Sequence, residues 1–169
     1  MIRRPLRPDD VDRAVAIYNH YVATSTATFH TDPLTAEEWL AEVTPSDEER
    51  HGVWALGDPL VGYLVVSPFK SRCAYADTAE VTIYLDPEHT GRGFGTKTTT
   101  FVDEHAREAG LHALLAVVCA ENTASLALFT RAGYDEVARL REVGRKFGRL
   151  LDVVYLERLL SPQDDAPSS

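Results

Sequence analysis

The sequence lacks any apolar run of the roughly 18–20 residues that a membrane-spanning helix requires. Its first residues, Met1-Ile2-Arg3-Arg4-Pro5, also lack the apolar core of a signal peptide. Because both absences argue against membrane insertion and export, we expect a cytoplasmic protein without a membrane partner. The length of 169 residues, with 44% hydrophobic and 25% charged residues, is typical of one globular domain around one core.

Cysteine is scarce, and histidine is scattered along the chain. The two cysteines, Cys73 and Cys119, lie too far apart for a metal-binding or redox motif, so we expect reduced, packed thiols. The six histidines include no pair at the i, i+4 spacing of a helical zinc site. We therefore predict no metal cofactor.

Basic residues are outnumbered, with 17 Lys and Arg against 26 Asp and Glu and a net charge of −9. This balance argues against nonspecific attraction to nucleic acid or to anionic membranes. The C-terminal quarter is locally basic through Arg139, Arg141, Arg145, Lys146 and Arg149. A nucleic-acid surface is one interpretation of this cluster, and attraction of an anionic substrate is another. Because the whole chain is acidic, we favour the plainer interpretation of a solvated hairpin and expect no nucleic-acid partner.

The most informative segment is residues 79–96, in which a strand pattern is followed by three alternate glycines and a helical pattern. Apolar side chains alternate, as in a half-buried strand, at Val81, Ile83 and Leu85. The glycines precede a helical pattern that Gly110 ends. At a helix N-terminus, unpaired backbone amides and the helix dipole bind phosphate oxygens, and glycine lets the phosphate approach the backbone. Taken alone, however, a tight turn that needs positive φ explains the glycines equally well.

Two known phosphate-binding motifs do not fit this segment. A dinucleotide fingerprint follows the first strand of a βαβ unit and carries an acidic residue about 20 residues later. Several elements precede the glycines here, and the window around Leu111 to Leu115 contains no acid. A Walker loop is excluded because no Gly-Lys-Ser/Thr follows.

Arg92-Gly93-Phe94-Gly95 resembles the pyrophosphate loop of the GNAT superfamily of N-acetyltransferases, usually Gln/Arg-x-x-Gly-x-Gly/Ala. The resemblance covers roughly residues 2–158 and is strongest to phosphinothricin N-acetyltransferases and related amino-acid N-acyltransferases. An ordered set of motifs carries it: Asn19-His20-Tyr21, Thr24-Ser25-Thr26 through Phe29, Lys70-x-Arg72 with Ala74-Tyr75, Ala79-Glu80, and Gly144-x-Lys146-x-Gly148 through Asp152-Val153. Such a set is far more specific than one glycine loop.

The order of the elements agrees with the fold that this resemblance implies. We expect an α/β (α+β) layered sandwich with a mixed, mostly antiparallel central sheet flanked by helices on both faces, in a single acyl-CoA N-acyltransferase domain over residues 1–160. The patterns place strands at 2–6, 53–56, 60–66, around Glu80, 113–119, 134–141 and 151–157. They place helices after Pro8, after the capping box Thr35-x-x-Glu38, after the glycines, and at 123–132. Residues 161–169, rich in Pro, Asp and Ser, are expected to be disordered.

The resemblance implies that acetyl-CoA is the co-substrate. Strands around Thr82 and Val118 would part to admit the pantetheine arm, whose amides the backbone of Ile83, Tyr84 and Leu85 would bind. The implied diphosphate loop comprises Gly91, Arg92, Gly93, Phe94, Gly95 and Thr96, and the implied helix motif contributes Asn122, Ser125 and Phe129. The plainer role of Asn122, helix capping, is compatible with cofactor binding.

Glu80 is the candidate catalytic residue, because an amine is mostly protonated at neutral pH and must lose a proton before it attacks a thioester. The resemblance places Glu80 at the matching glutamate, and the strand pattern places its side chain opposite to that of Val81. A glutamate exposed at the start of a strand is the plainer interpretation.

Three positions depart from the resembled pattern. Phe129 stands where many members have a tyrosine that protonates the departing thiolate. The thiolate would then leave unassisted, or Tyr84 or Tyr75 would supply the proton. Thr90 stands where Gln or Arg is usual, and Leu150 replaces a tryptophan common in the subgroup.

The implied acceptor is a small-molecule amine of the phosphinothricin, methionine sulfone or methionine sulfoximine type. Arg72 and Lys70 would bind its carboxylate, and Tyr75 and Phe29 would line the acceptor pocket. A solvated loop at residues 70–72 and a core Phe29 are almost equally good interpretations. Transfer to a peptide or protein amine, and a non-catalytic acyl-CoA sensor, remain alternatives. Relatives are commonly homodimers, so we expect a homodimer.

Overall fold

The computed structural model describes residues 3–45, 47 and 49–160. Its strands are β1 (Arg3–Pro5), β2 (Gly52–Leu56), β3 (Gly62–Pro68), β4 (Thr78–Leu85), β5 (Ala113–Cys119), β6 (Asp135–Lys146) and β7 (Arg149–Leu159). Its α-helices are α1 (Val11–Thr24), α2 (Ala36–Val43), α3 (Phe94–Glu108) and α4 (Thr123–Arg131). The expected tail at 161–169 and Ile2, the first residue of the expected first strand, lie outside the described residues.

Across the described residues, the strands form one seven-stranded sheet in the order β1-β2-β3-β4-β5-β7-β6. β4 and β5 pair in parallel, and every other neighbouring pair is antiparallel. The predicted mixed, mostly antiparallel sheet is therefore confirmed. In the part of the chain that the structure describes, no helix is long and apolar enough to cross a membrane.

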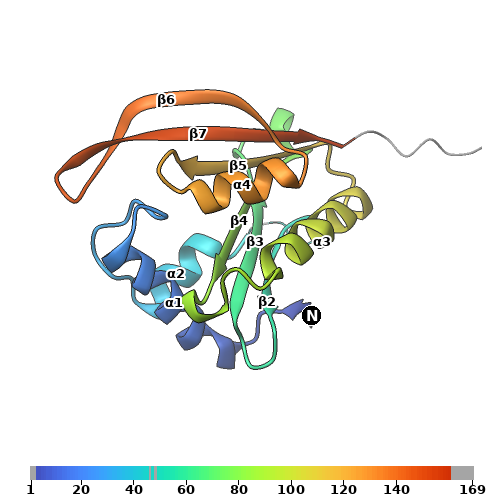
Figure 1. The fold of residues 1–169 in the computed structure, drawn as a ribbon. Helices are drawn as coiled ribbons and strands as arrows, with labels where there is room; N and C mark the ends of the chain where they lie inside the picture. The colour runs from blue at the N-terminus through green and yellow to red at the C-terminus, as the bar shows by residue number, and fades with distance from the viewer. Residues whose placement is uncertain (1–2, 46, 48, 161–169) are drawn as a thin grey trace, which may run out of the picture.

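Helices cover both faces of the sheet, as predicted (Figure 1). Adjacent side chains of a strand point to opposite faces, and on β3 the side chain of Leu64 enters one core while those of Tyr63 and Val65 enter the other. The Leu64 core contains Val102 of α3 and Phe129 of α4. The opposite core packs α1 and α2 against the sheet.

β4 and β5 form a fork. They pair only from Thr78 with Ala113 to Glu80 with Leu115, whereas β4 is paired with β3 from Ala79 to Leu85 and β5 is paired with β7 along its whole length. Beyond Glu80, the edge of β4 that faces β5 has no strand partner among the described residues. The parting of the strands around Thr82 and Val118 that the resemblance implies is thus present.

The local signals for helix ends are confirmed where they are strongest. The Thr35 side chain accepts a hydrogen bond from Glu38 N–H, and the Glu38 carboxylate accepts one from Thr35 N–H, which completes the capping box of α2. Gly110, with φ of +69°, follows the last turn of α3. Leu111 N–H then bonds back to Ala106 C=O, as in a glycine-terminated helix.

The C-terminal hairpin is longer than predicted. β6 runs to Lys146 and β7 begins at Arg149, so that Phe147 and Gly148 alone form the turn. Both turn residues have positive φ, +50° and +73°. A phenylalanine gives no signal for such a turn, because side chains with a Cβ rarely adopt this conformation. Register shifts after Glu136 and Leu140 also interrupt the alternation from which strand length is predicted.

Candidate active site

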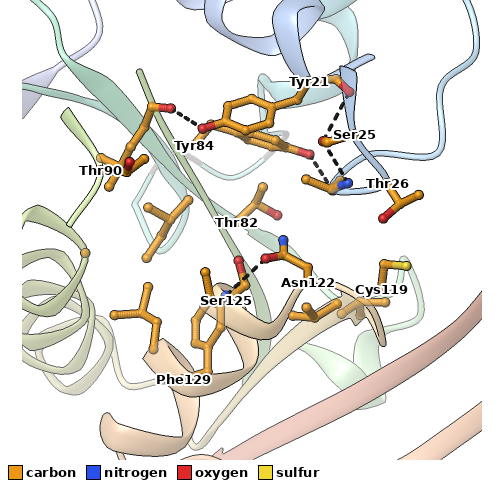
Figure 2. A pocket seen from close by; sticks show the side chains of 18 of the residues that line it. Tyr21, Ser25, Thr26, Thr82, Tyr84, Thr90, Cys119, Asn122, Ser125 and Phe129 are labelled. Carbon is orange, nitrogen blue, oxygen red and sulfur yellow. Dashed lines mark hydrogen bonds between the residues drawn. The ribbon is translucent and has the colours of Figure 1, made fainter. Parts of the chain in front are cut away.

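A cavity of about 1080 Å³ lies in the fork between β4 and β5. Its lining comes from α1 and the loop after it, from β4, from the loop before α3 and the first turn of α3, from the end of β5 and the turn after it, from α4, and from Val153 of β7. In Figure 2, the rings of Tyr21 and Tyr84 lie on one side of the cavity, and Asn122, Ser125 and Phe129 lie on the other. The fork opens because the parallel pairing stops after three residue pairs, from Thr78–Ala113 to Glu80–Leu115.

Two of the predicted loop glycines leave room for an anion beside the backbone. Gly91 and Gly93 line the cavity and have φ of +71° and +78°. A Cβ built at either position meets no atom within 4 Å, so each would project into open space. Gly93 is the N-cap of α3, and the first helical bond runs from Lys97 N–H to Gly93 C=O. The amides before Lys97 have no partner within the helix and can bind phosphate oxygens.

The third glycine has a different role. A Cβ on Gly95 would lie 2.9 Å from Cδ2 of Leu128, so this glycine lets α3 pack closely on α4. The side chains of the two residues beside Gly93 do not line the cavity. Arg92 is exposed, and the ring of Phe94 packs edge-on against His89. Thr96 does line it.

The start of α4 presents the polar side chains of Asn122 and Ser125 to the cavity. Asn122 is the N-cap of α4, and its Oδ1 accepts a hydrogen bond from Ser125 N–H at 3.1 Å. Its amide nitrogen lies on the cavity side (Figure 2). The capping role is thus confirmed, and it leaves the Nδ2 donors available for a ligand. Phe129 is buried, and its ring packs edge-on against Tyr134 at 5.0 Å between centroids.

The end of β4 is held by two tyrosines. Ile83, Tyr84 and Leu85 all line the cavity. Tyr21 donates its hydroxyl to Leu85 C=O at 2.6 Å, and Tyr84 donates its own to Ala27 C=O at 3.1 Å. Burial raises the pKa of Tyr84, so that its phenol stays protonated. The unpaired edge of β4 therefore offers fixed backbone groups to an extended ligand.

Glu80 lies at the fork point, in the last paired position of β4 with β5. Its side chain is partly buried and lines the cavity. Burial raises the pKa of the Glu80 carboxyl, and the positive charge of Lys70 partly opposes this rise. A carboxylate with a raised pKa is a better proton acceptor for an amine than an exposed one.

The structure divides the predicted acceptor residues between two places. Phe29 lines the large cavity together with Glu80. Lys70, Arg72 and Tyr75 lie instead on the connection between β3 and β4, around a separate hollow of about 400 Å³. There the ring of Tyr75 packs edge-on against Phe69.

Several cavity residues were given no role in the sequence interpretation. The loop after α1 contributes Ser25 and Thr26, the end of β5 contributes Cys119, and the turn after β5 contributes Glu121. Glu121 pairs with Arg149 at 2.5 Å, and this hydrogen bond lowers the pKa of the Glu121 carboxyl. Only the motif Thr24-Ser25-Thr26 signalled any of them, and it gave no indication that this loop faces β5.

Comparison with known proteins identifies the family and agrees with the fold. Residues 1–135 match the family model described as "Acetyltransferase (GNAT) domain". The chain is 37% identical over 163 residues to a phosphinothricin N-acetyltransferase of Streptomyces coelicolor, covering 93% of this chain and 95% of that protein. It is 27% identical over 161 residues to an L-methionine sulfoximine/L-methionine sulfone acetyltransferase of Pseudomonas aeruginosa, covering 94% of each. A phosphinothricin acetyltransferase from Sinorhizobium meliloti, solved in complex with AcCoA, superposes with a TM-score of 0.86 at 25% identity, covering 94% of this chain and 88% of that one.

Proposed function

Because the chain belongs to the GNAT acetyltransferase family, we propose that it transfers the acetyl group of acetyl-CoA to the amine of a small amino-acid-like acceptor. The observation that carries this proposal is the pairing of a glycine loop with the fork. Gly91 and Gly93 leave open space at the N-terminus of α3, and that space continues along the unpaired edge of β4 to Glu80. A long donor with a diphosphate at one end and a thioester at the other matches this continuity.

The donor side of the cavity has the required chemistry. The amides at the start of α3 bind the diphosphate, and the open edge of β4 at residues 81–85 binds the amides of the pantetheine arm. Backbone N–H groups along this edge also stabilise the negative charge that develops on the thioester oxygen during attack. The acetyl-CoA itself supplies the activated acyl group.

Glu80 acts as the base. Its carboxylate takes a proton from the acceptor ammonium, directly or through water, and frees the nitrogen lone pair. The nitrogen then bonds to the carbonyl carbon as the bond from that carbon to sulfur breaks, and the electron pair leaves on the CoA thiolate. The acylated nitrogen loses its second proton to this thiolate or to water, which gives the neutral amide and CoA. Burial keeps the pKa of Glu80 above its ordinary value and so improves it as a proton acceptor.

The thiolate leaves without help from a phenol. Phe129 has no proton to give, and the Tyr84 hydroxyl is already donated to Ala27 C=O. Tyr75 lines the separate hollow beside Lys70. A thiol with an ordinary pKa near 8.5 is a sufficiently good leaving group for this step.

The acceptor enters on the Phe29 side of the cavity. The relatives named above act on phosphinothricin or on methionine sulfoximine and sulfone, so we propose an acceptor with a carboxylate and a compact polar side chain. Lys70 is the candidate for the carboxylate, because its positive charge acts on Glu80. Arg72 adds a second positive charge at the neighbouring hollow, which Tyr75 also lines.

Release of free thiol from acetyl-CoA tests the proposal. The purified protein is assayed with phosphinothricin, methionine sulfone, methionine sulfoximine, the free amino acids and short peptides. We expect release with at least one free amino-acid-like acceptor and none above background with the peptides. Release only with peptides would favour a peptide or protein amine as acceptor. Tight binding of CoA without any release would favour an acyl-CoA sensor, which the missing phenol at Phe129 would explain.

The homodimer is also a proposal, and exposed apolar side chains on the C-terminal hairpin support it. Val137, Leu140 and Val143 of β6 are 52%, 41% and 57% exposed. A second copy would remove this apolar surface from water. Light scattering coupled to size-exclusion chromatography tests the proposal, and a monomeric mass at micromolar concentration would contradict it. We place the reaction in the cytoplasm, where acetyl-CoA is made and used.

A further inference from the structure

We propose that Gly144 and Lys146 of β6 position the loop segment 26–29 at the cavity and thereby determine which acceptors the enzyme accepts. This inference rests on the proposed function and extends it to a motif, Gly144-x-Lys146-x-Gly148, that the mechanism does not use. Both residues act through Phe29 and its neighbours, so they are positioning residues. The physical basis is a contact between two segments more than a hundred residues apart in the sequence.

Lys146 is an unusual residue for its strand. The other eleven residues of β6 are exposed or half-buried, and Lys146 alone is buried, at 3% exposure. Its Nζ donates a hydrogen bond to Thr28 C=O at 2.8 Å. Removing an ammonium from water is costly without a compensating partner, and burial lowers the pKa of Lys146 with no carboxylate offsetting it in the described part of the chain. The Nζ atom also lies 5.1 Å from the centroid of the Phe147 ring in the hairpin turn, and Thr28 C=O is the hydrogen-bond acceptor that this buried charge has outside the hairpin.

Gly144 makes the second contact with the same segment. A Cβ built on Gly144 would lie 2.1 Å from Cε2 and 2.7 Å from Cδ2 of Phe29. The Phe29 ring thus lies directly against the backbone of β6, in a place that only glycine leaves free. Gly144 is not among the residues with positive φ, so its backbone tolerates a side chain. The restriction at this position is the presence of the ring.

Two further bonds hold the segment from other elements. Tyr18 of α1 shares a hydrogen bond of 2.6 Å with Thr28 Oγ1, and Tyr84 of β4 donates to Ala27 C=O. The segment is thus fastened by α1, β4 and β6 while Thr26, Ala27 and Phe29 line the cavity with Glu80. The bonds from α1 and β4 hold Thr28 and Ala27, whereas the close approach of Gly144 to the Phe29 ring makes β6 the element that restricts where this ring lies. We infer that a change at β6 alters the acceptor side of the cavity and leaves the donor side intact.

Substitution of Lys146 tests the inference. Lys146→Met removes the charge and the hydrogen bond and keeps the apolar stem, whereas Lys146→Arg keeps a buried donor. Arg145→Met removes a cation from the adjacent, exposed position of the same strand and serves as the matched control. We expect K146M to raise the KM for the acceptor about tenfold, the usual effect of losing a hydrogen bond to a charged group. The kcat, the affinity for acetyl-CoA and all parameters of R145M should stay within about threefold, and K146R should recover part of the acceptor KM.

Hydrogen exchange of the backbone amides gives a readout that does not require turnover. In K146M, amides 26–29 should exchange faster than in the wild type, while amides of α3 and β5 should not. Unchanged exchange in 26–29, or an unchanged acceptor KM in a folded K146M, would overturn the inference. A wild type that releases no thiol with any acceptor would instead overturn the proposed function, and the exchange experiment would still decide the positioning role.

Gly144→Ala provides a second test if K146M does not fold. The added methyl displaces the Phe29 ring, so the ratio of kcat/KM between a small and a bulky acceptor should change by about tenfold. In the double variant Gly144→Ala, Phe29→Leu the clash is relieved, and the two effects should be clearly non-additive. Additive effects, or an unchanged selectivity in G144A, would show that β6 does not position Phe29.

Discussion

Glu80 and Leu115 form the last residue pair that joins β4 to β5. Beyond this pair the two strands diverge, and the backbone edge of β4 faces the cavity. The candidate base therefore lies where the pairing of β4 with β5 ends and the cavity begins. This juxtaposition places a carboxylate of raised pKa beside the backbone groups that we propose as the binding site of the thioester arm.

The exchange of Glu80 for glutamine should lower turnover by about a hundredfold, the usual contribution of a general base. Glutamine keeps the size of the side chain but cannot take a proton. In the wild type, turnover should fall as the pH falls through the raised pKa of Glu80, and this acidic limb should be absent or moved in E80Q. The rate of thiol release, measured as a function of pH, gives both the turnover and its acidic limb. Glu104→Gln, on the exposed face of α3, is the control. An unchanged pH profile in E80Q would remove Glu80 from the role of base.

The same carboxyl should make stability depend on pH. Because burial raises its pKa above the ordinary value of 4.5, the folded state holds a proton that the unfolded state releases between the two pKa values. The free energy of unfolding should therefore fall as the pH rises through this window. E80Q has no charge to bury, so it should gain stability relative to the wild type at pH 8 and show little difference at pH 4. Urea unfolding at pH 4 and pH 8 measures the free energy of unfolding of both proteins. An equal difference between E80Q and the wild type at the two pH values would contradict the prediction.

Alanine at Gly93 should weaken acetyl-CoA binding by about tenfold or more, because the methyl projects into the space beside the amides of α3. Positive φ at this position adds a stability cost of roughly 1–2 kcal/mol. Gly148→Ala is a matched control, since Gly148 also has positive φ and open space around a Cβ but lies in the hairpin turn. Calorimetric titration should show a reduced affinity for acetyl-CoA in G93A only, whereas thermal unfolding should show a similar loss of stability in G93A and G148A. Equal affinities would count against the diphosphate loop.

Two substitutions at Asn122 should separate capping from ligand binding. Asn122→Ala removes the cap of α4 and should cost about 1 kcal/mol of stability, whereas Asn122→Ser keeps a capping oxygen. Both variants lose the Nδ2 donors on the cavity side, so both should bind acetyl-CoA about fivefold more weakly. Denaturant unfolding and titration with acetyl-CoA measure the two effects independently. If N122S bound acetyl-CoA with wild-type affinity, Asn122 would have only the role of capping α4.

Local patterns were sufficient for much of the fold. Three local signals are confirmed: the alternation at Val81 and Ile83, the capping box at Thr35 and the terminal Gly110. Each depends on residues only a few positions apart in the sequence. Strand β5 was predicted with the bounds it has. The resemblance carried by the ordered motifs supplied the family and the parting of β4 from β5, which no periodicity could show.

The lengths of β6 and β7 and the separation of the acceptor residues could not be obtained in the same way. Phe147 occupies a turn position that usually favours glycine or asparagine, so the hairpin was predicted too short. Arg72 and Tyr75 share a motif with Lys70, but the connection between β3 and β4 carries them to a hollow apart from Phe29. Gly95 stood in the motif beside Gly93, yet its neighbour in space is Leu128.

The sequence by itself determined the order of the elements, the glycine turn at the start of α3 and the family, because these depend on residues close together along the chain. Only the tertiary structure decided that Glu80 lies at the fork, that Gly93 opens into the cavity, and that Lys146 reaches Thr28. Such contacts join segments tens of residues or more apart, and their geometry depends on how the two cores pack on the twisted sheet. Neighbours in a motif therefore indicate a shared chemistry, but packing determines which of them meet at one site.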